Sequence, residues 1–234
     1  MRGLYKVEYR YGSGGGRSVM YARDGKLLGG NSAFAHLGKY DTDDDGNLTA
    51  HIATLRHNPD PAYKLLLSSE TSMIVARGRA TGDVLRFEGA TSDMPDVIFR
   101  SVMTPLNDAT SPPPGAVGEG GIVNGLYSLH IRMLDGIGGG NTGVMLLLDG
   151  SILGGDAYFY YLGSYSSARG RWKGEMVNQE HTPAASERPL FGGHEVGIGF
   201  SGSCDAETAQ AEATALVGKR SIRFAAELKL LRKA

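Results

Sequence analysis

The residues with the clearest chemical potential in this chain form one acidic run. Four carboxylates fall within five residues, those of Asp41, Asp43, Asp44 and Asp45. The pattern Asp-x-Asp-x-Asp-Gly opens an EF-hand calcium loop, in which oxygen ligands alternate and the glycine allows a sharp turn. The twelfth position of that loop requires a glutamate, and here it is Ile52. The flanking residues are also typical of strands and not of helices, so we expect no metal at this run.

Two other interpretations of the acidic run stay open. One is a solvated hairpin tip whose charges keep a strand edge soluble. The other is a surface that docks a basic partner, because clustered like charges steer association and set specificity. On the second interpretation, the candidate partner-binding residues are Asp41, Asp43, Asp44 and Asp45.

The six histidines and the single cysteine have no spacing that indicates catalysis or metal binding. His-x-x-x-His and Cys-x-x-Cys pairs are absent, and so is a Gly-x-Ser-x-Gly nucleophile elbow. His57 and His181 stand where strands should end, so we expect each ring to bond a loop carbonyl or to face solvent. Cys204 should be an inert thiol. We therefore expect no catalytic residue, no metal and no cofactor, and a protein that is not an enzyme.

Two glycine-rich stretches resemble phosphate-binding loops in composition only. Residues 12–16 and 136–140 are followed neither by a Lys-Ser/Thr pair nor by a helix whose N-terminus would bind a phosphate. We expect both stretches to be mobile hairpin loops.

An internal repeat indicates how these residues are positioned. Three motifs recur in the same order: Gly-Leu-Tyr at 3 and 125, Asp-Gly followed by Leu-Gly-Gly at 24 and 149, and Leu-Gly-x-Tyr at 37 and 162. The offset is 122 residues for the first motif and 125 for the other two. A steady offset of this size indicates a duplicated domain, because solenoid units repeat every 20 to 50 residues.

Apolar and polar residues alternate in short segments of each copy, which predicts β-strands. In the first copy, turn residues divide these segments into eight strands, at about 3–11, 16–23, 26–30, 33–41, 47–57, 71–81, 84–92 and 97–106. Asp-Gly between two such segments is a strong hairpin signal. Residues 225–231 contain good helix formers, but the repeat aligns them with the strand at 97–106, so we expect a strand there too. The pattern predicts an all-β fold, with an up-and-down barrel preferred over a sandwich.

The repeat divides the chain into a first barrel at residues 1–106, a linker at 107–122 and a second barrel at 123–234. The linker is rich in proline and glycine and has few side chains that could build a core. The tandem arrangement suggests that the two copies pack as an intramolecular pseudo-dimer, with further homo-oligomerisation left open.

Composition excludes several other classes of protein. Glycine makes up 35 of the 234 residues, which favours a turn-rich fold over a helical one. The 24 basic and 25 acidic residues give a net charge of −1, without the basic excess of a protein that binds nucleic acid directly. The apolar run at Val144–Leu148 is far shorter than the ~20 residues of a membrane span, and one cysteine allows no intramolecular disulfide. We expect a cytoplasmic protein that does not bind membranes.

The Gly-Leu-Tyr opening, the Asp-Gly hairpin, the Leu-Gly-x-Tyr strand and the acidic turn together resemble the GrlR-type family of negative regulators of type III secretion. The resemblance spans nearly the whole chain outside the linker, with one such domain in each copy. It implies a lipocalin-like (calycin) eight-stranded barrel that tends to dimerise, and a surface acidic motif that holds a helix-turn-helix transcription activator. Asp43, Asp44 and Asp45 match that motif, whereas the second copy has Ser166–Arg171 there.

The leading functional hypothesis is a non-enzymatic cytoplasmic regulator that sequesters a basic protein, such as a transcription activator, through the acidic run. An alternative from another class is a carrier or sensor that holds a small apolar ligand inside a barrel. Eight strands enclose an interior that is either filled by side chains or just wide enough for one small ligand. A divergent hydrolase or isomerase would need a cluster of titratable groups at a barrel mouth.

Overall fold

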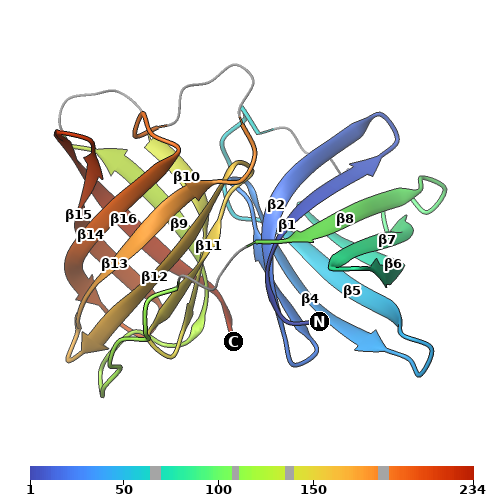
Figure 1. Ribbon diagram of the computed structural model, residues 1–234, viewed down its shortest axis with the longest axis horizontal. Helices are drawn as coiled ribbons and strands as arrows, with labels where there is room; N and C mark the ends of the chain where they lie inside the picture. Colours follow the sequence, from blue (N-terminus) through green and yellow to red (C-terminus); the bar gives the residue numbers. More distant parts are fainter. Residues whose placement is uncertain (64–69, 107–110, 135–139, 184–189) are drawn as a thin grey trace. The chain divides into compact units, whose positions relative to one another are not determined.

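A computed structural model of the chain describes residues 1–63, 70–106, 111–134, 140–183 and 190–234. Within these ranges the chain forms sixteen strands and no helix (Figure 1). The chain divides into two compact units, Met1–Asp108 and Ala109–Ala234, each built around one closed barrel. The all-β prediction of two tandem eight-stranded antiparallel barrels is therefore confirmed.

The first barrel is an antiparallel meander in which each strand pairs with the next and β8 returns to β1. Its strands are β1 (Gly3–Tyr11), β2 (Gly14–Arg23), β3 (Lys26–Gly30), β4 (Phe34–Thr42), β5 (Asn47–Arg56), β6 (Thr71–Thr81), β7 (Val84–Thr91) and β8 (Phe99–Pro105). Inward side chains of all eight strands form the core, which includes Val7, Met20, Leu27, Ile74 and Phe87.

The second barrel repeats this meander, and β16 closes it against β9. Its strands are β9 (Gly125–Met133), β10 (Gly140–Leu148), β11 (Ser151–Gly155), β12 (Phe159–Ala168), β13 (Arg171–Glu180), β14 (Glu195–Cys204), β15 (Thr208–Val217) and β16 (Arg220–Lys233). Its core contains Trp172, which packs against Phe200 with ring centroids 4.6 Å apart and donates a hydrogen bond to the backbone of Gln210.

The predicted hairpins at Asp24-Gly25 and Asp149-Gly150 are confirmed. Asp24 and Asp149 have φ of 49° and 48°, and each following glycine also has a positive φ, of 77° and 85°. Two consecutive residues with positive φ form a type I′ turn, whose twist matches that of the flanking strands. The strand prediction for residues 225–231 is also confirmed, since they lie within β16.

The prediction of a mobile loop at residues 12–16 is wrong for most of that stretch. Only Gly12 and Ser13 form the turn, and Gly14–Gly16 pair with β1 as the start of β2. The reason is steric: a Cβ atom on Gly16 would lie 2.5 Å from the hydroxyl oxygen of Tyr9, whose ring crosses that position. Glycine here makes room for an aromatic ring. Of the second predicted loop, residues 136–139 lie outside the described residues.

The distal part of the predicted linker, residues 111–122, lies against the second barrel. Gly118 donates a backbone hydrogen bond to Ser167 at 2.8 Å, and Ser167 donates one to Ala116 at 3.0 Å. Ile122 is 2% exposed and belongs to the core of that barrel. Residues 107–110 lie outside the described residues.

Steric crowding explains the glycine of the repeated Leu-Gly-x-Tyr motif, and this explanation can be tested. A Cβ atom on Gly163 would lie 2.3 Å from the carbonyl oxygen of Glu175 and 2.7 Å from the Cα atom of Met176. Gly163→Ala should therefore lower the free energy of unfolding by about 1–3 kcal/mol, the usual cost of overpacking. The readout is denaturant unfolding followed by the fluorescence of Trp172, the only tryptophan, which lies in the same barrel.

Gly197→Ala is the matched control in β14. A Cβ atom there would meet nothing within 4 Å, and its φ is not positive. Loss of glycine at such a site should leave the stability unchanged or raise it by about 0.4–1 kcal/mol. Equal destabilisation by both substitutions would contradict the steric explanation.

Candidate functional site

The interior of the first barrel contains a cavity of about 50 Å³, counted as the space open to the centre of a water molecule. One water needs about 10–15 Å³ on this measure, so the cavity has room for a few water molecules or a small organic molecule. Its lining is mostly apolar, and includes Val7, Met20, Ile74, Phe87 and Met103. Six polar side chains join them: Tyr9, Tyr11, Ser18, His36, Thr54 and Ser101.

Strand alternation brings these polar residues to the interior. Tyr9 and Tyr11 lie on β1, Ser18 on β2 and His36 on β4, each two residues or a multiple of two from another cavity-lining residue on its own strand. Successive side chains of a strand point to opposite faces, so such residues share the inner face.

Three of the polar side chains have buried atoms without a hydrogen-bond partner among the described residues. They are both ring nitrogens of His36, the Oγ of Ser18 and the hydroxyl of Tyr11. The three residues are only 7%, 1% and 7% exposed. Buried polar atoms in proteins nearly always have a partner, because leaving one unpaired costs about 1–3 kcal/mol. The cavity therefore contains several hydrogen-bonding groups that no described residue pairs with.

The His36 ring has a lowered pKa. Burial is the main cause of the shift from 6.5 to about 4, and the nearby His57 contributes to it in the same direction. The ring is therefore neutral at pH 7, with one nitrogen as a donor and the other as an acceptor. The ring of Tyr9 meets it edge to face, with centroids 6.2 Å apart.

Asn31 holds the neighbouring turn and so positions Tyr9. Its side-chain oxygen accepts hydrogen bonds from the backbone N–H groups of Ala33 and Phe34, at 3.0 and 2.9 Å. Its amide nitrogen donates to the Tyr9 hydroxyl at 3.3 Å and to the Arg17 carbonyl at 3.0 Å. Asn31 thereby links β1, β2 and the start of β4.

The second barrel has different residues at the positions of His36 and Ser18, and there the polar side chain has an internal partner. Tyr161 replaces His36, since these residues pair with the equivalent glycines Gly154 and Gly29. Gly143 replaces Ser18, and the Tyr161 hydroxyl lies 2.9 Å from where a Gly143 Cβ would be. That hydroxyl donates to the carboxylate of Asp156 at 3.2 Å.

Asp156 is the counterpart of Asn31 and completes this network. Its carboxylate accepts hydrogen bonds from the backbone of Tyr158 and Phe159 and from the Asn141 amide, at 2.8, 2.8 and 3.1 Å. Burial nevertheless raises the pKa of Asp156, outweighing these hydrogen bonds. Tyr161 and Asp156 thus form a hydrogen bond with each other, whereas His36 and Ser18 do not.

The acidic run spans the end of β4, which contains Asp41, and the turn into β5, which contains Asp43, Asp44 and Asp45 (Figure 1). It lies at the opposite end of β4 from His36. Asp43 builds the turn: its carboxylate accepts hydrogen bonds from the Asn47 side chain and from the backbone of Asn47 and Asp45, at 2.9, 2.8 and 3.1 Å. The Asn47 side-chain bond is the main cause that lowers the pKa of Asp43. Asp41, Asp44 and Asp45 are exposed.

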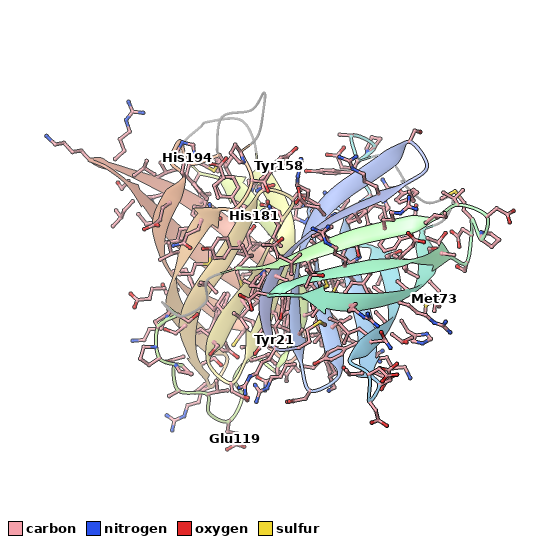
Figure 2. All side chains as sticks on the ribbon, turned by 45° about the vertical axis from the view of Figure 1, so that its right-hand side comes forward. Tyr21, Met73, Glu119, Tyr158, His181 and His194 are labelled. Atoms are coloured by element: carbon pink, nitrogen blue, oxygen red, sulfur yellow. The ribbon has the colours of Figure 1, made fainter. Side chains whose placement is uncertain are left out.

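The predicted role of His57 and His181 is confirmed. Nε2 of His57 lies 3.0 Å from the carbonyl oxygen of Asn31, and Nε2 of His181 lies 3.4 Å from that of Asp156. Figure 2 shows His181 beside Tyr158, at the end of the second barrel away from Glu119.

Burial raises the pKa of Cys204, which disfavours its reactive thiolate.

Sequence reasoning missed His36 and Ser18. The signal was present in the repeat: at matched inward positions the first copy has His36 and Ser18 where the second has Tyr161 and Gly143. Among the residues that the structure describes, no group of three or more His, Cys, Asp or Glu is arranged to hold a metal ion.

Fold and cavity define the class of this protein, a tandem of two closed antiparallel eight-stranded barrels of which the first has a partly polar interior. Comparison with protein-family models, curated proteins and solved structures finds no match to the chain. In the described part of the chain no helix is long and apolar enough to cross a membrane.

Titration of His36 tests the buried neutral ring. Its midpoint by NMR of ring-labelled histidine should be about 4, below its ordinary value of 6.5. The unfolded chain then binds more protons between these two pH values, so this residue's contribution to stability is complete above pH 6.5 and is lost as pH falls through 4. His36→Gln assigns the signal and should flatten this part of the pH dependence. A midpoint near 6.5 would contradict burial of the unpaired ring.

Proposed function

We propose that the first barrel binds a small, uncharged and largely apolar molecule in its interior. The observation that carries this proposal is the cavity beside His36, Ser18 and Tyr11, whose buried polar atoms have no partner among the described residues. A ligand with one group that both donates and accepts hydrogen bonds, such as a hydroxyl or an amide, would meet that demand. Its apolar part would contact the methionine and aromatic side chains of the lining.

The electrostatics of the lining favour an uncharged ligand. None of the seventeen residues around the cavity is Lys, Arg, Asp or Glu, and its histidine is neutral at pH 7. A buried carboxylate or ammonium group without a counter-charge would lose its hydration and gain too little in return.

The volume of the cavity limits the ligand to a few non-hydrogen atoms unless side chains move. Met20 and Met103 line it, and unbranched methionine side chains adapt readily to ligands of different shape. A ligand of five or six non-hydrogen atoms should bind with a dissociation constant on the order of 1 mM.

Three compounds of similar size test this proposal: 1-butanol, butanamide and butyrate. The first two should shift the methyl NMR signals of Met20 and Met103, and butyrate should bind about tenfold more weakly because its charge would be buried. Met145, the counterpart of Met20 in the second barrel, is the internal control and should not shift. The proposal fails if no compound shifts the two methionines of the first barrel.

A matched variant transfers the internal network of the second barrel to the first. Ser18→Gly, Asn31→Asp and His36→Tyr together reproduce Gly143, Asp156 and Tyr161. The new tyrosine should fill the space beside position 18, so binding of butanamide should fall at least tenfold while the strand pairing persists. Unchanged binding would show that the compound does not enter the cavity.

The acidic turn supports a second candidate function, the capture of a basic protein in the manner of the GrlR-type regulators that the sequence resembles. The specific observation is that all four carboxylates are exposed, and that Asp43 also accepts the hydrogen bonds that hold the turn in place. A fixed turn with several free carboxylates can steer and orient a basic partner.

Binding of a lysine-rich peptide tests this second function. The variant Asp41→Asn, Asp44→Asn and Asp45→Asn should bind it about tenfold more weakly, since each exposed ion pair contributes about 0.2–1 kcal/mol. The difference should shrink as salt is added. Asp24→Asn with Asp83→Asn is the control, because these residues lie in other turns at the same end of the barrel. The control removes two charges and the variant three, so the loss of affinity is compared per charge removed. Equal loss per charge would show that only net charge matters.

A further inference from the structure

The second barrel has an open strand edge that the linker covers. β12 runs past β11, whose pairing ends at Ser151 opposite Ser164. Beyond that point the backbone of Ser167 faces away from β13 and would have no strand partner. Linker residues fill the place: Ser167 donates to Ala116 at 3.0 Å, and Gly118 donates back to Ser167 at 2.8 Å. The linker thereby joins this edge as a short parallel strand, with a bridge at Val117.

The same linker segment continues around the β12–β13 turn. Arg169 and Gly170 donate backbone hydrogen bonds to the carbonyls of Glu119 and Gly120, at 2.9 and 2.7 Å. The segment then ends on Ile122, which is buried in the core. Figure 2 shows Glu119 at this end of the second barrel.

Charge is complementary across this contact. Glu119 is the only ionisable residue of linker residues 111–122, and the turn that the linker follows contains Arg169 and Arg171. An acidic segment therefore lies on a basic turn.

The first barrel has the equivalent edge, and none of the described residues covers it. β4 runs past β3, whose pairing ends at Lys26 opposite Lys39, and Tyr40 donates to Gly25 at 2.8 Å just as Tyr165 donates to Gly150. Thr42 is thus the counterpart of Ser167.

The backbone of Thr42 faces outward. Asp43 donates its backbone N–H to Asn47 on β5, and alternate residues of an antiparallel strand direct their hydrogen bonds to opposite sides. Thr42 is exposed, and none of the described residues forms a hydrogen bond with its backbone N–H or C=O.

We propose that the Thr42 edge of β4 binds an extended, basic segment of a partner protein as an added strand, in the way that the linker binds the Ser167 edge of β12. Main-chain hydrogen bonds would supply affinity, as in other cases of strand addition. The charge of the segment follows from the turn, because the first barrel has Asp43, Asp44 and Asp45 there, whereas the turn of the second barrel contains Arg169. This inference rests on the second candidate function and specifies how the partner is held.

Two synthetic peptides test the proposal on the full chain. One has the sequence of residues 111–122, and the other is identical except for Glu119→Lys. The lysine peptide should bind at least fivefold more tightly than the glutamate peptide. At saturation it should slow hydrogen exchange of the Thr42 amide, which is exposed in the free chain.

Substitutions at position 42 distinguish the contribution of main-chain hydrogen bonds from that of the nearby carboxylates. Thr42→Pro removes the outward N–H and leaves every carboxylate in place, so affinity for the lysine peptide should fall about tenfold. Thr42→Val keeps the N–H and is the matched control, with unchanged affinity. Hydrogen exchange on the unaltered chain provides an independent test if the proline variant does not fold.

The outcomes distinguish this inference from the function on which it rests. Binding of the lysine peptide without protection of the Thr42 amide, or undiminished binding to a folded Thr42→Pro variant, overturns strand addition and leaves charge-based capture standing. Equal binding of both peptides overturns the requirement for a basic segment. If neither these peptides nor the lysine-rich peptide binds, both the inference and the second candidate function are wrong.

Discussion

Closure of each barrel by the ladder between its first and last strands is the constraint on which the other features depend. β1 pairs with β8 and β9 with β16, so every strand pairs with two neighbours. Closure creates an interior in which an unpaired polar side chain is costly. It also leaves open edges only where a strand runs past its neighbour, as β4 and β12 do. The cavity and the open edge are therefore two consequences of one geometry.

The two copies differ in the same way at the cavity and at the open strand edge. In the second barrel Tyr161 and Asp156 satisfy each other inside, and the linker occupies the edge at Ser167. In the first barrel the polar atoms of His36 and Ser18 lack partners, and the edge at Thr42 is uncovered among the described residues. The second copy thus serves as an internal reference that shows what a completed site looks like. On our proposals the first copy is the one that binds.

The preferences of neighbouring residues predicted most of the strands and turns, but they misplaced some of the glycines. Asp24-Gly25 and Asp149-Gly150 form hairpins because their preference for positive φ is a property of two adjacent residues. Gly14 and Gly15 were expected in a loop, yet they pair with β1 as part of β2, and a Cβ atom on the adjacent Gly16 would meet the ring of Tyr9. Residues 225–231 show the opposite case, in which the repeat correctly overrode local helix preference.

The sequence by itself determined the duplication, the strands and the position of the acidic run, since each is encoded in residue order and alternation. Only the tertiary structure decided that His36 and Ser18 share a cavity in which no described residue bonds their buried polar atoms, and that Asp43 accepts the hydrogen bonds of its own turn. It also decided that the linker pairs with the edge at Ser167, while none of the described residues pairs with the edge at Thr42. These features depend on distances between residues far apart in the chain, and on which hydrogen bonds remain unmade once the barrel has closed. Alternation can show that a side chain points inward, but not which groups it contacts in the interior.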